Sequence, residues 1–296
     1  MNIHDQIRSN QRRSILLVII FFCLIGVLSA FLGIFLGNII FGLVIGMIFA
    51  VIYTIIVFNS GGNMILTMTG AKPVTKQEFP HLYHTVEGLT LAAGLKNIPK
   101  CYVIEDSALN AFATGKNSEN SCIVVTTGLM KVLNRQELEG VIAHEMSHIK
   151  NQDIKVMMLA AVLVGITVLI SDFLLRSLIF GKRDDEAGNA KIVLIIVGVL
   201  LAILAPLIAE LIKLGISRKR EFLADADGAK LTRYPRGLAD ALRKISQDPD
   251  PLVDNANKAT AHLFISTPFR NTKGWFTGLF STHPDIKIRI QILEEM

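Results

Sequence analysis

Two long apolar runs near the start of the chain limit its fold more than any other feature. Residues 15–36 and 39–58 contain no charged side chain. Each run is long enough to cross the roughly 30 Å hydrocarbon core of a bilayer as a helix. Gly37 and Asn38 lie between them as a turn pair, so the sequence predicts a helical hairpin. The alternative for the first run is a cleaved signal peptide, but the run is long for such a segment and a second apolar run follows at once.

Two further apolar runs, residues 156–180 and 192–216, indicate a second membrane hairpin. Asp172 and Arg176 interrupt the earlier run at a spacing that lets them pair on one helix face. The later run contains Pro206, Glu210 and Lys213. Because both runs carry charges, a pair of buried core helices in a soluble domain is the alternative. The whole chain is 51% hydrophobic and 19% charged, which is more apolar than an ordinary soluble protein, and we expect four membrane spans.

Basic residues flank three of the four apolar runs. They precede the first run, precede the third and follow the fourth: Arg8, Arg12, Arg13, Lys150, Lys155, Arg218, Lys219 and Arg220. With four spans these flanks share one side of the membrane, and the positive-inside rule makes that side cytoplasmic. Topology and attraction to anionic lipids then account for the net charge of +5. We expect the lipid bilayer as a partner and no nucleic acid, because no basic stretch is interleaved with aromatic residues.

Residues 134–153, with the sequence NRQELEGVIAHEMSHIKNQD, predict one amphipathic helix. Asn134 followed by Glu137 is a capping-box start. Four residues of helix turn through about 400°, so His144 and His148 share a face and can place two imidazoles on one metal ion. Glu145 can reach a water bound to that ion. The H-E-x-x-H pattern is typical of catalytic zinc sites, although chance alone would give it in about one chain in a hundred.

A catalytic zinc ion usually takes a third protein ligand, and Glu221 is the candidate. It follows the fourth apolar run, and Asp225 comes four residues later on the same helical face. Glu221 would bind the metal, and Asp225 would accept the free N–H of a ligating histidine. The alternative is an acidic pair at the start of a solvated helix, favoured by the helix dipole. We expect one zinc ion per chain, just above the cytoplasmic membrane surface.

The other soluble segments predict a small α+β domain. Residues 75–95 should form a helix. The short β-branched runs at residues 100–104 and 122–126 suggest a small antiparallel sheet that precedes the motif helix. Near the C-terminus, the pattern predicts helices at residues 234–247 and 284–295.

Four sequence segments outside the apolar runs form a joint signature: NAFATG at 110–115, VTTGLM at 125–130, ELEGVIAHEMSHIKN at 137–151 and SRKREFLAD at 217–225. Together they resemble the HtpX-type membrane metalloproteases, which belong to the wider group that includes the CAAX-prenyl endopeptidases. The resemblance extends over nearly the whole chain. It implies an inner-membrane zinc endopeptidase that degrades misfolded or damaged membrane proteins under stress.

The resemblance also implies roles for individual residues. Glu145 would be the catalytic residue, and the metal ligands would be His144, His148 and Glu221. Asn110 matches a position on a strand edge that holds the substrate backbone by strand addition. His283 and Arg289, within STHPDIKIRI, match a histidine and an arginine that stabilise the oxyanion.

The predicted fold is a mainly α integral membrane protein. Four transmembrane helices would carry a cytoplasmic α+β metalloprotease domain of the zincin type with a small antiparallel sheet. The expected divisions are a first membrane hairpin, the part of the protease domain with the HEMSH helix, a second hairpin, and the part with the third ligand: residues 1–58, 59–155, 156–216 and 217–296.

The expected activity is zinc-assisted hydrolysis of peptide bonds in membrane-protein or unfolded polypeptide substrates. Glu145 would take a proton from the zinc-activated water and pass it to the leaving amine. The alternative is a zinc-binding membrane scaffold without turnover. An intramembrane protease is disfavoured, because polar residues flank the motif too closely for that helix to lie in lipid: Asn134, Arg135, Gln136, Lys150, Asn151 and Asp153.

Overall fold

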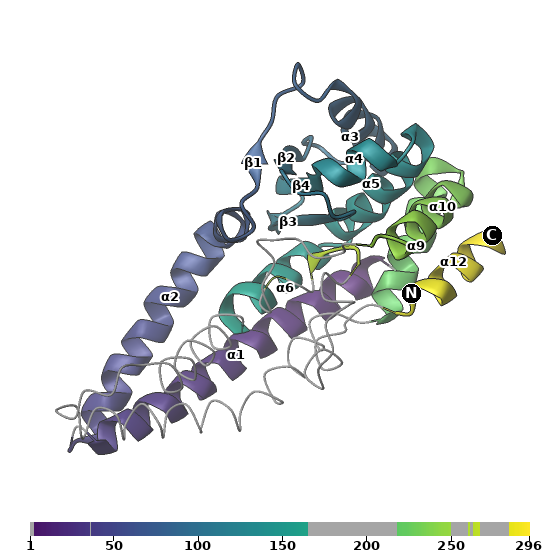
Figure 1. The fold of residues 1–296 in the computed structure, drawn as a ribbon. Coiled ribbons are helices and arrows are strands. Elements are labelled where there is room, and N and C mark those ends of the chain that lie inside the picture. The colour runs from purple at the N-terminus through teal and green to yellow at the C-terminus, as the bar shows by residue number, and fades with distance from the viewer. Residues whose placement is uncertain (1–2, 36, 165–217, 250–259, 261–262, 267–283) are drawn as a thin grey trace.

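The computed structural model describes residues 3–35, 37–164, 218–249, 260, 263–266 and 284–296. Two long helices, α1 (Ile3–Phe35) and α2 (Ile39–Met68), form an antiparallel hairpin whose turn end points away from the sheet (Figure 1). Gly37 makes the turn with a left-handed φ of 74°. The side chain of Asn38 caps α2 by accepting the Phe41 N–H at 3.0 Å. The structure therefore confirms a helical hairpin here, although α2 continues to Met68, beyond the predicted apolar run.

Small residues bring α1 and α2 close together. A Cβ added at Gly42 would lie 2.4 Å from Ser29 O, so only glycine fits this crossing. The outer surface of the hairpin is apolar, with Ile40 as much as 74% exposed. Within the described residues, the segments Arg8–Ala30 and Ile39–Met68 are long and apolar enough to cross a membrane.

A four-stranded sheet has the strand order β1-β2-β4-β3. Its strands are β1 (Lys72–Pro73), β2 (Lys100–Ile104), β3 (Ala111–Asn117) and β4 (Asn120–Thr126). β3 and β4 are antiparallel, but β2 and β4 are parallel, so the prediction of an antiparallel sheet is wrong for the central pair. The reason is the path of the chain. After β2 it crosses to the far edge and forms β3, and the following hairpin then returns β4 between them in the direction of β2.

Helices cover both faces of the sheet. The helices that follow α2 in the described residues are α3 (Pro80–Ala93), α4 (Thr127–Val132), α5 (Arg135–Lys150), α6 (Asp153–Leu159), the π-helix Ala160–Val164, α9 (Arg218–Thr232), α10 (Pro235–Ser246) and α12 (Ile286–Glu294). The sheet face with Ile123 and Val125 shares a core with α3, α5 and α10. The opposite face, with Phe112 and Val124, shares a core with α1, α2 and α6. The sheet therefore joins the long hairpin to α5, which carries the HEMSH motif, and to the helices packed with it.

The two C-terminal helices, α10 and α12, confirm those predicted at residues 234–247 and 284–295. α3 begins at Pro80, later than predicted, because proline is suited to the first turn of a helix. The segment before it is a turn in which Glu78 accepts the Thr75 N–H at 2.7 Å.

The motif helix also ends earlier than predicted. α5 ends at Lys150, Gln152 adopts a left-handed φ of 57°, and α6 begins at Asp153. Because of this break, α6 changes direction and runs alongside α1 (Figure 1).

The start of the third predicted span packs against the first hairpin. Residues 156–163 are buried, and the Tyr53 hydroxyl of α2 donates to Val162 O at 3.1 Å. The remainder of the predicted second hairpin, residues 165–216, lies outside the described residues.

Candidate metal centre

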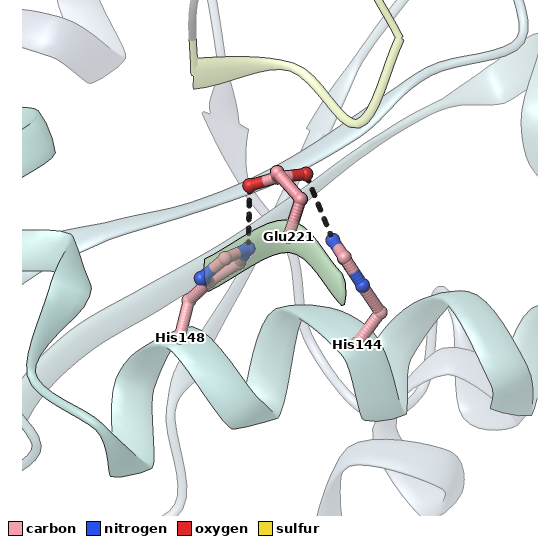
Figure 2. A group of neighbouring side chains, drawn as sticks. All are labelled: His144, His148 and Glu221. Atoms are coloured by element: carbon pink, nitrogen blue, oxygen red, sulfur yellow. Dashed lines mark ion pairs between the residues drawn. The ribbon is translucent and has the colours of Figure 1, made fainter. Parts of the chain in front are cut away.

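α5 and α9 bring the predicted ligands together. α5 begins with the predicted capping box, in which Asn134 Oδ1 accepts the Glu137 N–H at 3.0 Å and the Glu137 carboxylate accepts the Asn134 N–H at 2.8 Å. α9 crosses α5 so closely that a Cβ at Gly228 would lie 3.0 Å from His144 N. This crossing places Glu221, in the first turn of α9, above the middle of α5 (Figure 2).

His144, His148 and Glu221 form one buried group in which all ligand atoms lie within 4.8 Å of one another. Glu221 Oε1 is 3.4 Å from His148 Nε2, and Glu221 Oε2 is 3.8 Å from His144 Nε2 (Figure 2). Each of the three residues is at most 3% exposed. Two imidazoles and a carboxylate that converge in this way fit a zinc ion with a fourth position open for water.

The ring of His144 is held from behind by Asp225. His144 Nδ1 lies 2.9 Å from Asp225 Oδ1, as predicted for a carboxylate that fixes the tautomer of a ligating histidine. Arg289 of α12 donates to the same carboxylate through Nε at 2.8 Å and Nη2 at 2.7 Å. Burial raises the pKa of Asp225, but the charge and hydrogen bonds of Arg289 and the hydrogen bond with His144 together outweigh it and lower this pKa to about 2. Asp225 therefore stays ionised behind His144.

The ring of His148 has its own carboxylate, Asp153, which the sequence analysis did not identify. His148 Nδ1 lies 3.1 Å from Asp153 Oδ2. Burial lowers the pKa of His148, but the hydrogen bond to Asp153 and the charge of Glu221 outweigh it and raise this pKa to about 9. A metal ion that binds His148 Nε2 would thus displace a proton. The predicted helix, residues 134–153, included Asp153, so the sequence pattern did not mark its return toward His148.

Glu145 lies between the motif helix and the outer strand of the sheet. It is 2% exposed. Burial raises the pKa of its carboxyl, and the neighbouring His144 and His148 oppose this shift. The backbone N–H of Ala113, in β3, also donates to Glu145. The carboxyl is therefore beside both histidines and beside the strand edge to which a peptide could add.

Asn110 immediately precedes β3 and is engaged with the chain itself. Its Nδ2 donates to Ser266 O at 2.9 Å, and its Oδ1 accepts the Ser266 N–H at 3.3 Å. Next to it, the Ile265 N–H donates to Ala111 O at 2.8 Å. The outer edge of β3 thus bonds to the backbone of a bent segment, residues 264–266.

Of the two predicted oxyanion residues, the structure places one. Arg289 is 1% exposed, and its Nη1 lies 3.9 Å from Glu221 Oε2. Its other two nitrogens donate to Asp225, so its direct contacts are with groups around the metal centre. His283 lies outside the described residues.

The fold and the site together define a class of protein, the zinc metallopeptidases with an H-E-x-x-H helix and a glutamate from a second helix.

Comparison with known proteins gives the family. The pattern of peptidase family M48 matches residues 76–296, and the chain belongs to this family. A protease HtpX homolog from Dictyoglomus turgidum is 43% identical over 293 residues, which cover 99% of this chain and 94% of the relative. A second, from Dictyoglomus thermophilum, is 48% identical over 239 residues, covering 81% and 77%.

A solved structure has a similar fold. The crystal structure of Ste24p from S. mikatae superposes with a TM-score of 0.51 at 21% sequence identity. The match covers 90% of this chain but only 61% of that protein. At this identity the likeness concerns the fold alone.

Proposed function

We propose that the chain is a membrane-anchored zinc endopeptidase that cleaves misfolded or damaged membrane proteins and unfolded polypeptides. The observation that carries the proposal is the buried group of His144, His148 and Glu221 with Glu145 beside it. Membership of family M48 supports peptide bonds as the substrate. The two long apolar helices support a membrane location. The quality-control role rests on the resemblance to the HtpX-type proteases.

The chemistry is divided between the metal and Glu145. Zinc, when bound by His144, His148 and Glu221, polarises the scissile carbonyl and lowers the pKa of its water. The Glu145 carboxylate accepts the proton of that water and delivers it to the leaving amine. Because burial raises the pKa of Glu145, this carboxyl is suited to carry the proton between the two steps.

The edge of β3 is the proposed binding place for the substrate backbone. The Asn110 side chain bonds both the N–H and the C=O of Ser266, and it would make the same pair of bonds to the backbone of an extended substrate that took the place of this segment. Ala113, two residues further along this edge, contacts Glu145. A peptide aligned there would therefore have its scissile bond close to the catalytic carboxyl.

Zinc, His283 and Arg289 would stabilise the negative charge that develops on the substrate oxygen. Arg289 would act mainly through its charge and through Asp225, because two of its nitrogens already donate to that carboxylate.

The test is Glu145→Gln in full-length, detergent-purified protein. We expect zinc content to equal that of the wild type and cleavage of an unfolded substrate such as casein to fall by about 10²- to 10⁴-fold, because the general base is lost. Glu139→Gln, on the same helix but partly exposed, is the matched control and should cleave normally. Full activity in Glu145→Gln would refute the assignment. Zinc-loaded wild type without any turnover would favour the scaffold.

The proposed topology places four spans in the membrane and the metal centre on the cytoplasmic side. Its support is the distribution of basic residues around the apolar runs. Glu186 lies between the third and fourth apolar runs, on the outer side in this topology. In a variant without native cysteines, a cysteine introduced in its place should react with a membrane-impermeant reagent from outside intact cells. A cysteine in place of Lys287 should react only after the membrane is opened. Labelling of both positions from outside would contradict the topology.

A further inference from the structure

The first helix of the hairpin reaches the metal centre through Asn10. This residue precedes the apolar run of α1 and is 3% exposed. Its Nδ2 donates to Asp153 Oδ1 and to Asn151 O, both at 2.9 Å. Both bonds cross more than a hundred residues of sequence, and they join α1 to the segment that links α5 and α6.

Asp153 is the point at which these contacts meet the metal centre. One oxygen, Oδ2, holds His148 Nδ1 at 3.1 Å. The other oxygen, Oδ1, accepts from Asn10 and also from Arg220 Nη1 at 2.9 Å. Donors from α1, α5 and α9 therefore fix both oxygens of a carboxylate that is 4% exposed. A buried carboxylate held in this way has little freedom to rotate, and it transmits its orientation to the imidazole.

The backbone near Asp153 needs this support. Gln152 has a left-handed φ of 57°, a conformation that is unfavourable for a residue with a side chain. The resulting break directs Asp153 back toward His148. Asn10 holds the break on one side through Asn151 O, and the Asn151 side chain donates to Asp227 Oδ2 at 3.0 Å on the other.

We infer that Asn10 is a positioning residue of the metal centre: α1 orients His148 through Asp153, so the first membrane helix is part of the zinc site and not only an anchor. The inference rests on the proposed role of His148 as a zinc ligand. It predicts that a change at Asn10 alters metal coordination although Asn10 touches neither metal nor substrate.

The experiment compares Asn10→Leu with Ser14→Ala in full-length, detergent-purified protein. Ser14 is the matched control because it lies one turn further along α1, is also buried, and its hydroxyl has no hydrogen-bond partner among the described residues. Zn²⁺ affinity is measured by competition with a chromogenic chelator. The absorption spectrum is recorded at saturating Co²⁺, where a loss of stability alone would not change it. Steady-state kinetics on a peptide give kcat and KM separately.

For Asn10→Leu we expect Zn²⁺ affinity to fall about tenfold, a shifted Co²⁺ spectrum, and a lower kcat with KM unchanged, since partners behind a ligand typically contribute 10- to 100-fold in affinity. Ser14→Ala should match the wild type in all three. A wild-type Zn²⁺ affinity and Co²⁺ spectrum in Asn10→Leu would overturn the inference, even if that variant unfolded at a lower temperature.

His148→Ala separates the inference from the proposed function. If this variant retains wild-type Zn²⁺ affinity, His148 is not a ligand and the assignment of the metal centre fails with the inference. If it loses Zn²⁺ while Asn10→Leu binds normally, only the positioning role of Asn10 is wrong.

Discussion

The two histidines of the metal centre have the same local chemistry but different outer supports. Each directs Nε2 toward Glu221 and Nδ1 toward an aspartate. Behind His144, Asp225 is compensated by the fully buried guanidinium of Arg289, from α12. Behind His148, Asp153 is held by Arg220 of α9 and by the neutral amide of Asn10, from α1.

The difference shows how a membrane enzyme can link its anchor to its chemistry. The support of His144 comes from α9 and α12, and the charges of Asp225 and Arg289 balance each other inside the protein. The support of His148 crosses to the long hairpin, so the position of that ligand depends on how α1 packs against α6. Displacement of α1 would therefore affect His148 before it affects His144.

The largest loss of stability is expected from a change at Arg289, behind His144. Arg289→Met would leave Asp225 buried without its cation, and removal of one partner from a buried pair typically costs about 3–5 kcal/mol. We expect a large drop in unfolding temperature and loss of bound zinc, measured by thermal denaturation and metal analysis of the detergent-purified protein.

Arg243→Met is the control for this prediction. Arg243 pairs with Asp240 and Glu294, but its side chain is 42% exposed, so its loss should cost less than about 1 kcal/mol and leave zinc bound. If both variants behaved alike, the buried pair behind His144 would not be the dominant support that the structure indicates.

The parts of the site that follow from local spacing could be predicted from the sequence. His144 and His148 are four residues apart on one helix, and so are Glu221 and Asp225, so helical geometry alone places each pair on a face. The capping box at Asn134 is local in the same way.

The support of His148 could not be predicted by that reasoning. In a continuous helix, Asp153 would lie about 140° around the helix axis from His148, on a different face. Only the left-handed Gln152 brings it back, and no turn residue such as glycine marks that position. Asn10 has no local signal, because its partner is more than a hundred residues away. The parallel pairing of β2 and β4 was missed for a similar reason, since it depends on the path between the strands and not on their residues.

A smaller effect tests whether the two supports are independent. Asn10→Leu, Asp153→Asn and Asp225→Asn would be combined in pairs, and the free energy of Zn²⁺ binding would be measured for each single and double variant. Asn10 acts through Asp153, so this pair should be non-additive, with a coupling of up to about 1.4 kcal/mol, which is the whole tenfold effect expected of Asn10→Leu. In a variant where Asp153 no longer holds His148 in its native orientation, the further loss of Asn10 should change the free energy of Zn²⁺ binding only slightly.

Within the described residues, no hydrogen bond joins Asn10 to Asp225 and their hydrogen-bond partners differ, so their effects on Zn²⁺ binding should add to within roughly 0.5 kcal/mol. A coupling between them as large as that between Asn10 and Asp153 would contradict the division into two supports. It would mean that Glu221, which lies between the two imidazoles, transmits a shift of His148 to His144 and that the first membrane helix controls the whole metal centre. Additivity would instead limit the influence of α1 to one ligand.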